Sequence, residues 1–285
     1  MLTLVFPTKG MNKVKTKARK IFSYKRICLT ICGVLLVTQL AAPRAQAAPT
    51  VIYTALGDSI GFGLFASIGN GYVPTYDRFL EADSGANVKT INLCVPGWTS
   101  SDLRNAIRGN LLFRVSVATS TIVTVNIGGN DLLGARGDYK DRTCGGADNQ
   151  DCLRSGVAVF AANFNAILSE VRALRGSRAT IIRTMDVYNP FVNEDRAQDT
   201  WPNDQGNDFQ VFKPYLEAIN GQIAAAATAR NIPFAQVYLS FNGPNGDIDP
   251  SNLGLLAFDG LHPNTSGHRR IANLLRGLGY SPFQF

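Results

Sequence analysis

Short runs of consecutive apolar residues, rich in Val, Ile and Thr, recur five times along the chain. Most of them are near-continuously apolar, which is typical of strands that are buried on both faces of a parallel sheet. We therefore predict five strands. They cover Val51–Leu56, Val88–Leu93, Thr121–Ile127, Ala179–Met185 and Phe234–Leu239.

Segments with the spacing of amphipathic helices lie between these runs. The clearest is 155–176, where Val157, Phe160, Phe164 and Val171 fall on one stripe. Similar patterns cover residues 72–82, 100–112, 212–231 and 266–279. Alternating strands and helices predict an α/β fold, a three-layer α/β/α sandwich with a central five-stranded parallel sheet and right-handed crossovers. The ligand chemistry of such a sheet collects at the carboxyl ends of its strands.

The first 47 residues have a different character. They contain nine Lys or Arg and no Asp or Glu, and the basic part is followed by an apolar run, Ile27 to Ala42, and by the small-residue site Ala45-Gln46-Ala47. This pattern predicts a secretory signal peptide over residues 1–47, followed by one domain over residues 48–285. The alternative is a retained membrane anchor, although the apolar run is shorter than the ~20 residues that a spanning helix needs. We expect cleavage after Ala47, a secreted or extracytoplasmic product and no membrane span afterwards.

The leader also accounts for the basic character of the chain. Of 28 basic and 21 acidic residues, nine basic ones lie in the leader, which leaves 19 against 21 and a net charge of −2 for residues 48–285. A nucleic-acid partner is therefore not expected. We expect a monomer.

Three cysteines remain after the leader. Cys144 and Cys152 bracket the polar loop GGADNQD, and an oxidising compartment favours a disulfide between them over two free thiols. Cys94 ends an apolar run and is expected to be a buried free thiol.

Polar residues and glycines follow the first three predicted strands and also occur in the loop before the last predicted helix. In a parallel sheet with helices on both faces, these positions lie near the edge at which ligands bind. Ser59 comes directly after the first strand in the pattern G-x-S-x-G, and Gly97 follows the second strand. Asn130 follows the third strand in GGND, and Asp259 and His262 lie in DGLHP before the last helix. A serine hydroxyl becomes a nucleophile when a base such as His262 takes its proton, and Asp259 can orient that imidazole. The amides of Ser59 and Gly97 and the Asn130 side chain can serve as an oxyanion hole.

These four blocks, GDSI, Gly97, GGND and DGLHP, resemble those of the SGNH or GDSL hydrolases, in the same order and across the whole region after the leader. The resemblance implies a flavodoxin-like fold and a secreted esterase or lipase without a cofactor or metal. It also implies the roles just given for Ser59, His262, Asp259, Gly97 and Asn130. The first block reads GDSI instead of GDSL. An α/β-hydrolase elbow, which shares the G-x-S-x-G pattern, needs several strands before its serine, and there is no room for them here.

Several other interpretations stay open on sequence alone. His268 is expected to face solvent, and two histidines without helical i, i+4 spacing do not suggest a metal site. Asp58 is expected to brace the loop after the first strand. Phe191 and Trp201 are either walls of an acyl or sugar pocket or parts of an exposed loop. The activity expected is cleavage of small-molecule or lipid carboxylic esters through an acyl-enzyme, the alternatives being a carbohydrate acetylesterase acting on acylated glycans and a catalytically idle binding module.

Overall fold

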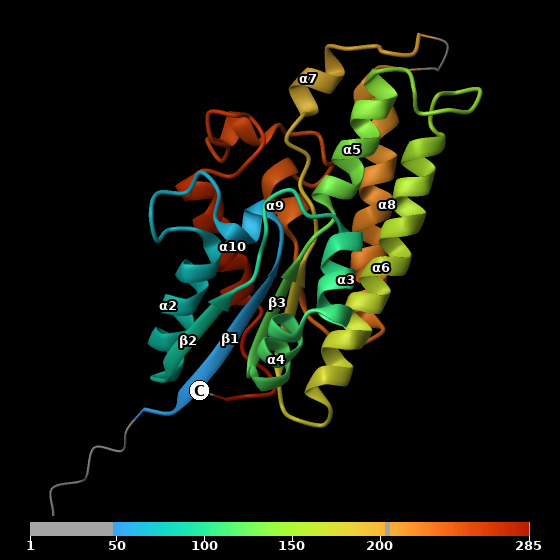
Figure 1. Ribbon diagram of the computed structural model, residues 1–285. Coiled ribbons are helices and arrows are strands. Elements are labelled where there is room, and N and C mark those ends of the chain that lie inside the picture. Colours follow the sequence, from blue (N-terminus) through green and yellow to red (C-terminus); the bar gives the residue numbers. More distant parts are fainter. Residues whose placement is uncertain (1–47, 203–205, 285) are drawn as a thin grey trace, which may run out of the picture. The chain divides into compact units, whose positions relative to one another are not determined.

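The structure is a computed structural model that describes residues 48–202 and 206–284; the predicted leader, 1–47, lies outside the described residues. Within the described part, five parallel strands form one sheet, as predicted, and the structure shows their order to be β2-β1-β3-β4-β5 (Figure 1). The strands are β1 Thr50–Gly57, β2 Asn87–Asn92, β3 Ile122–Asn126, β4 Ile181–Met185 and β5 Phe234–Ala235. The central strands β3 and β4 are buried along their whole length, whereas the edge strand β2 is mostly exposed or half-buried.

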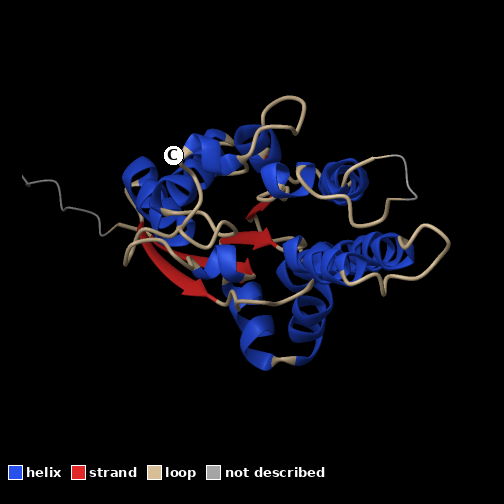
Figure 2. Cartoon of the chain, turned by 90° about the horizontal axis from the view of Figure 1, so that it is seen from above, coloured by secondary structure: helices blue, strands red, loops and turns tan. Residues whose placement is uncertain are grey.

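Helices cover both faces of this sheet (Figure 2). The helices are α1 Ser59–Phe62, α2 Tyr72–Ser84, α3 Ser100–Gly109, α4 Leu111–Thr119, α5 Gly129–Lys140, α6 Asp151–Arg175, α7 Val192–Arg196, α8 Asp208–Thr228, α9 Val237–Asn242 and α10 Thr265–Gly277, with a 3₁₀ turn at Pro250–Leu253. One apolar cluster packs α3, α4, α5, α6 and α8 against one face of the sheet, with Phe160, Phe164 and Ile219 fully buried. A second cluster packs α2 and α10 against the other face around Tyr76 and Ile271. The three-layer α/β/α architecture is therefore confirmed.

The fifth strand is shorter than predicted. It pairs with β4 through two residues, Phe234 and Ala235, and the chain then enters α9. The carboxylate of Asp186 accepts a hydrogen bond of 2.7 Å from the backbone N–H of Tyr238 in the first turn of α9. The apolar run through Leu239 is therefore divided between an edge strand and a helix, because only its first residues have a neighbouring strand.

Two helices also differ from the pattern. The helix predicted over residues 100–112 breaks at Asn110, which ends α3 and caps α4 by accepting a hydrogen bond of 2.9 Å from the N–H of Leu112. Helix α5 was not predicted, because its glycines and mixed polarity give it no apolar stripe along the sequence.

Cys144, in the loop after α5, and Cys152, in the first turn of α6, form the expected disulfide, and Cys94 is a buried free thiol. Within the described residues, α6 is the one helix long and apolar enough to cross a membrane by length and composition. Its apolar stripe is buried: Phe160, Phe164 and Ile167 have no exposed surface, so α6 has the character of a core helix.

The strand order places a switch in the middle of the sheet. The chain leaves β1 for β2 on one side and later returns to β3 on the other side. The loops that follow β1 and β3 therefore diverge above the sheet and leave room between them, which is where open α/β sheets bind their ligands.

Candidate active site

Ser59 stands at the junction of β1 and α1. The preceding residue, Asp58, caps the helix: its Oδ1 accepts a hydrogen bond of 2.9 Å from the N–H of Ile60. Helix α1 is a single turn and ends at Gly63, whose φ of 89° suits glycine. Ser59 is thus held on a short, capped turn at the carboxyl end of a buried strand.

The two glycines around this serine have no room for a side chain, because neighbouring residues lie too close to their Cα atoms. A Cβ on Gly57 would lie 2.3 Å from the carbonyl oxygen of Asn126, and one on Gly61 would lie 2.3 Å from the sulfur of Cys94. Neither glycine has the positive φ that would otherwise explain it. The G-x-S-x-G pattern in this chain therefore marks the close approach of the β1–α1 junction to its neighbours.

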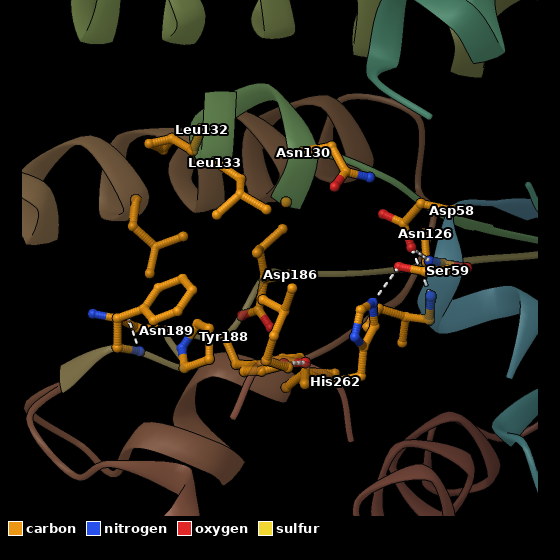
Figure 3. Close-up of a pocket in the computed structure, with 18 of the residues that line it drawn as sticks. Asp58, Ser59, Asn126, Asn130, Leu132, Leu133, Asp186, Tyr188, Asn189 and His262 are labelled. Atoms are coloured by element: carbon orange, nitrogen blue, oxygen red, sulfur yellow. Dashed lines mark hydrogen bonds between the residues drawn. The ribbon is translucent and has the colours of Figure 1, made fainter. Parts of the chain in front are cut away.

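His262 lies next to Ser59 although 203 positions separate them. Its Nε2 is 2.9 Å from Ser59 Oγ (Figure 3), and its Nδ1 is 2.5 Å from Asp259 Oδ2. The other carboxylate oxygen, Asp259 Oδ1, accepts hydrogen bonds from the N–H groups of Leu261 (3.2 Å) and His262 (3.1 Å). These bonds hold the carboxylate and the imidazole in one line with the serine.

The electrostatics of Asp259 follow from the same contacts. Partial burial alone would raise its pKa, but the hydrogen bonds from the His262 ring and from the two backbone N–H groups outweigh it and lower the pKa below the ordinary value. Asp259 is therefore a carboxylate at neutral pH. A carboxylate facing Nδ1 keeps a proton on that nitrogen and leaves Nε2 free to accept one from Ser59.

Asn130 lies in the first turn of α5, after β3, and lines the same cavity as Ser59 and His262 (Figure 3). Its side-chain nitrogen donates a hydrogen bond of 2.8 Å to the carbonyl oxygen of Trp98. An amide nitrogen carries two hydrogens, so one remains for a ligand. Asn130 is thus anchored from behind and keeps a donor for the cavity.

Gly97 lies in the tight turn of residues 95–98, in which the N–H of Trp98 bonds to the carbonyl of Val95 at 3.2 Å. Its φ of 82° explains the glycine, while a Cβ there would meet open space. Within the described part of the chain the N–H of Gly97 has no acceptor. The N–H of Ser59 occupies the first helical position, where a helix offers no acceptor either.

A network behind these residues was only partly expected. Asp58 braces the junction as predicted, since its Oδ1 also accepts a hydrogen bond of 2.9 Å from Asn126 Nδ2. Asn126 in turn accepts a bond of 2.5 Å from the hydroxyl of Tyr72. Burial raises the pKa of Asp58 to about 7, against the lowering effect of the hydrogen bonds from Ile60 and Asn126. The sequence signal for Asn126 was a polar residue ending an otherwise apolar strand.

An apolar cavity opens beside Ser59 and extends away from His262 (Figure 3). Its apolar walls come from β3, α5, the β4–α7 segment and α8, and include Ile127, Leu132, Leu133, Val187, Phe191, Phe212 and Leu216. Arg136 and Asp195 also line it and form an ion pair of 2.6 Å, with the Arg136 guanidinium 3.9 Å from the centre of the Phe191 ring. Phe191 is therefore a wall residue. Trp201 is not: it packs against the core cluster instead.

The prediction for His268 was wrong. Its side chain is fully buried, and burial lowers its pKa to about 4, with the nearby charge of His262 in the same direction and a hydrogen bond to Leu64 opposing. The spacing in α10 could have shown this, because His268 lies three, four and seven positions before the buried Ile271, Ala272 and Leu275. Among the described residues, no group of three His, Cys, Asp or Glu side chains could hold a metal ion.

Comparisons with known proteins identify the family and the fold. Residues 55–270 match the GDSL-like lipase/acylhydrolase family. A curated relative, the spore germination lipase LipC of Bacillus licheniformis, is 25% identical over 234 residues, which is 81% of this chain and 97% of the relative. Among solved structures, the lipase Lip_vut3 from a goat rumen metagenome has a TM-score of 0.67 at 22% identity and covers 82% of this chain and 100% of its own. A variant of the acetyl xylan esterase Axe2 of Geobacillus stearothermophilus has a TM-score of 0.54 at 19% identity, with 84% and 99% covered.

Proposed function

This chain belongs to the GDSL-like lipase/acylhydrolase family, as its motifs indicated, and we propose that it is a secreted serine hydrolase of carboxylic esters with Ser59 as the nucleophile. The observation that carries the proposal is the continuous row of Ser59, His262 and Asp259, joined by contacts of 2.9 and 2.5 Å. A serine, an imidazole and a carboxylate in this order are the groups that acyl transfer to a hydroxyl requires.

In the first half-reaction, His262 Nε2 takes the proton of Ser59 as Oγ attacks the ester carbonyl. Asp259 stabilises the imidazolium that forms. The tetrahedral intermediate then breaks down as His262 Nε2 gives its proton to the departing alcohol oxygen, which leaves an acyl group on Ser59. In the second half-reaction, His262 removes a proton from water, and the attack of that water on the acyl-enzyme releases the acid.

The oxyanion of each tetrahedral intermediate needs donors that are already in position. We assign this role to the N–H groups of Ser59 and Gly97 and to the side-chain amide of Asn130. The two backbone N–H groups have no acceptor within the described secondary structure around them. The side-chain nitrogen of Asn130 uses one hydrogen for the carbonyl of Trp98, at 2.8 Å, and keeps the other for the oxyanion.

The cavity beside Ser59 supports an aliphatic acyl group as the acid part of the substrate. Its walls between Ser59 and the Arg136–Asp195 pair are mostly apolar, with Asn130, Asp186 and Asn189 as polar lining residues, so a methylene that packs on the apolar walls leaves water. This favours esters with acyl chains of several carbons over acetylated glycans, the alternative drawn from sequence. The spore germination lipase among the relatives agrees with this choice.

The location and state of the protein are also proposals. We expect residues 1–47 to be removed as a signal peptide, which leaves residues 48–285 as a monomeric hydrolase domain outside the cytoplasm. The disulfide between Cys144 and Cys152 supports an oxidising compartment. The net charge of −2 on residues 48–285 supports an ester substrate without a nucleic-acid partner.

The test is covalent labelling of residues 48–285 with a fluorophosphonate, followed by peptide mapping. We expect one label, on Ser59, in the wild-type protein and none in Ser59→Ala. The turnover of an aryl butyrate should fall by a factor on the order of 10⁶ in Ser59→Ala, as for nucleophile deletions in other serine hydrolases. Ser177→Ala, a matched control at an exposed serine outside the site, should label and turn over like the wild type. An unlabelled wild-type protein would indicate the idle binding module.

A further inference from the structure

Two phenylalanines flank His262 outside the acyl cavity. Phe65 belongs to the loop between α1 and α2, and its ring centre lies 5.3 Å from that of His262. Phe258 stands four residues before His262, with its ring edge-to-face with Phe65 at 4.9 Å. Phe65 is 39% exposed and Phe258 is 91% exposed, and neither lines the cavity. These two rings are called the aromatic pair below.

The loop that carries Phe65 is held in place by buried hydrogen bonds. His268 is fully buried; its Nε2 donates to the carbonyl of Leu64 at 3.1 Å, and its Nδ1 accepts from the N–H of Tyr72 at 3.3 Å. A further bond of 2.9 Å joins the N–H of Ser67 to Thr265 Oγ1. The loop is therefore tied to α10, just after the segment that carries His262.

These hydrogen bonds hold Phe65 in an unfavourable backbone conformation. Phe65 has a φ of 61°, in the left-handed region that bulky residues rarely adopt. Such conformations persist only where the surrounding structure imposes them, and they gather at binding and catalytic sites. The bonds from His268 and Thr265 are that surrounding structure, and they place the Phe65 ring against the catalytic imidazole.

The loops around the aromatic pair carry no charge. Residues 61–71 read GFGLFASIGNG and residues 250–258 read PSNLGLLAF, without a single Lys, Arg, Asp or Glu. Ile68 and Leu253 are also exposed there. The polar side chains of the first loop already have partners: Asn70 Nδ2 donates to Ser67 Oγ at 3.0 Å, and Asn70 Oδ1 accepts from Arg78 at 3.3 Å. This surface offers apolar contact and few free hydrogen-bond partners.

The proposed reaction indicates which part of the ester lies near the aromatic pair. The departing alcohol oxygen must come within hydrogen-bond reach of His262 Nε2, because that nitrogen protonates it. In the proposed reaction the acyl chain enters the cavity, which Ser59 and His262 both line and which reaches towards Leu132 and Leu133 (Figure 3). The remaining substituent of the ester, the carbon skeleton of the alcohol, then extends past the imidazole towards Phe65.

We propose that the aromatic pair, Phe65 and Phe258, forms a subsite for the alcohol part of the ester and selects apolar or aromatic alcohols over polyols and sugars. This inference rests on the proposed catalytic role of Ser59 and His262. The alcohol packs against the two rings as the oxygen approaches Nε2. A sugar would lose hydrogen bonds to water there without gaining equivalent ones.

The experiment compares two ester series in the wild type, Phe65→Ala, Phe258→Ala and the double variant. One series keeps a butyryl group and changes the alcohol from methanol through hexanol and benzyl alcohol to glucose; the other keeps methanol and lengthens the acid. For the double variant we expect kcat/KM to fall about tenfold for hexyl and benzyl butyrate, the equivalent of two buried methylene groups. Methyl butyrate should change less than about twofold, and the acid series should keep its profile. Phe258→Leu, which keeps an apolar side chain, should retain most of the preference.

Phe191→Ala is the matched control, because this ring lines the acyl cavity. It should change the acid series and leave the alcohol series as it is. An equal loss for methyl and hexyl butyrate, a change confined to the acid series, or a larger loss for the glucose ester would each overturn the subsite. Labelling of Ser59 in every variant separates this failure from failure of the proposed function, which an unlabelled wild type would show.

Discussion

On one side of His262 lies a cavity whose walls belong to the interior of the protein, and on the other lie two surface loops. The cavity walls, such as Leu132 and Phe212, are also members of the apolar cluster beneath α5, α6 and α8. The aromatic pair belongs to two surface loops. Hydrogen bonds from α10 hold the loop of Phe65, and the side chain of Asn264, which caps α10, bonds to the carbonyls of Gly254 and Leu256 in the loop of Phe258. The acid side of the site is thus shaped by core packing, and the alcohol side by a few polar contacts. We expect changes on the two sides to alter specificity separately.

The largest change in turnover should come from a residue that contacts the ester carbonyl and therefore affects every substrate, whatever its acid or alcohol. Asn130→Ala removes a proposed oxyanion donor, and turnover should fall by ~10²–10³ for every ester. The ratios of kcat/KM within the acid and alcohol series should stay unchanged, because the donor contacts only the carbonyl oxygen. Steady-state kinetics over both series measure this.

A control for Asn130→Ala is the thermal midpoint, since the variant also loses the bond to Trp98. A midpoint within about 2–4 °C of the wild type would correspond to a loss of roughly 1 kcal/mol and leave the kinetics interpretable. Full turnover in a folded Asn130→Ala protein would contradict the assignment of this donor.

A smaller and one-sided effect is expected from Leu133→Trp, which puts a larger side chain into the cavity. A methylene that can no longer be buried costs about 0.8 kcal/mol, or about fourfold in kcat/KM. Octanoate esters that lose three such groups should therefore slow by a factor of tens, while acetate esters should be little affected. The isosteric control is Leu133→Met. A change in the alcohol series of the Trp variant would break the separation between the two sides.

The smallest effect concerns the support of the alcohol side. The folded pKa of His268, about 4, lies below the ordinary value of 6.5, so its stabilising contribution is complete above pH 6.5 and is lost as the pH falls towards 4. At pH 5 the unfolded chain has taken up the proton and the folded protein has not, a difference of about 2 kcal/mol. His268→Gln, which does not titrate, should lose less stability between pH 7 and pH 5 than the wild type. Thermal melts at both pH values measure the loss of stability between pH 7 and pH 5 in each protein. Equal losses in the wild type and in His268→Gln would refute the lowered pKa of His268.

Much of the fold was accessible from sequence because it depends on local patterns. Continuous apolar runs such as Thr121–Ile127 predicted buried parallel strands, and the stripe through Phe160 and Phe164 predicted a core helix. The prediction of the fifth strand was wrong beyond Ala235, because an apolar run does not reveal how many of its residues have a strand beside them. The prediction missed helix α5, because this helix is stabilised by packing on α6 and has little apolar pattern of its own.

The site divides in the same way. The motifs were enough to identify the family, the order of the elements and the residues that could act, since Ser59, Asn130 and His262 stand in recognisable patterns at strand and loop ends. The packing of distant elements was needed to show that Ser59 and His262 lie 2.9 Å apart, that His268 is buried beneath a loop, and that Phe65 contacts the imidazole. The reason is physical: a motif records what neighbouring positions need from one another, whereas contacts across 200 positions depend on how the helices and the sheet share their buried surfaces.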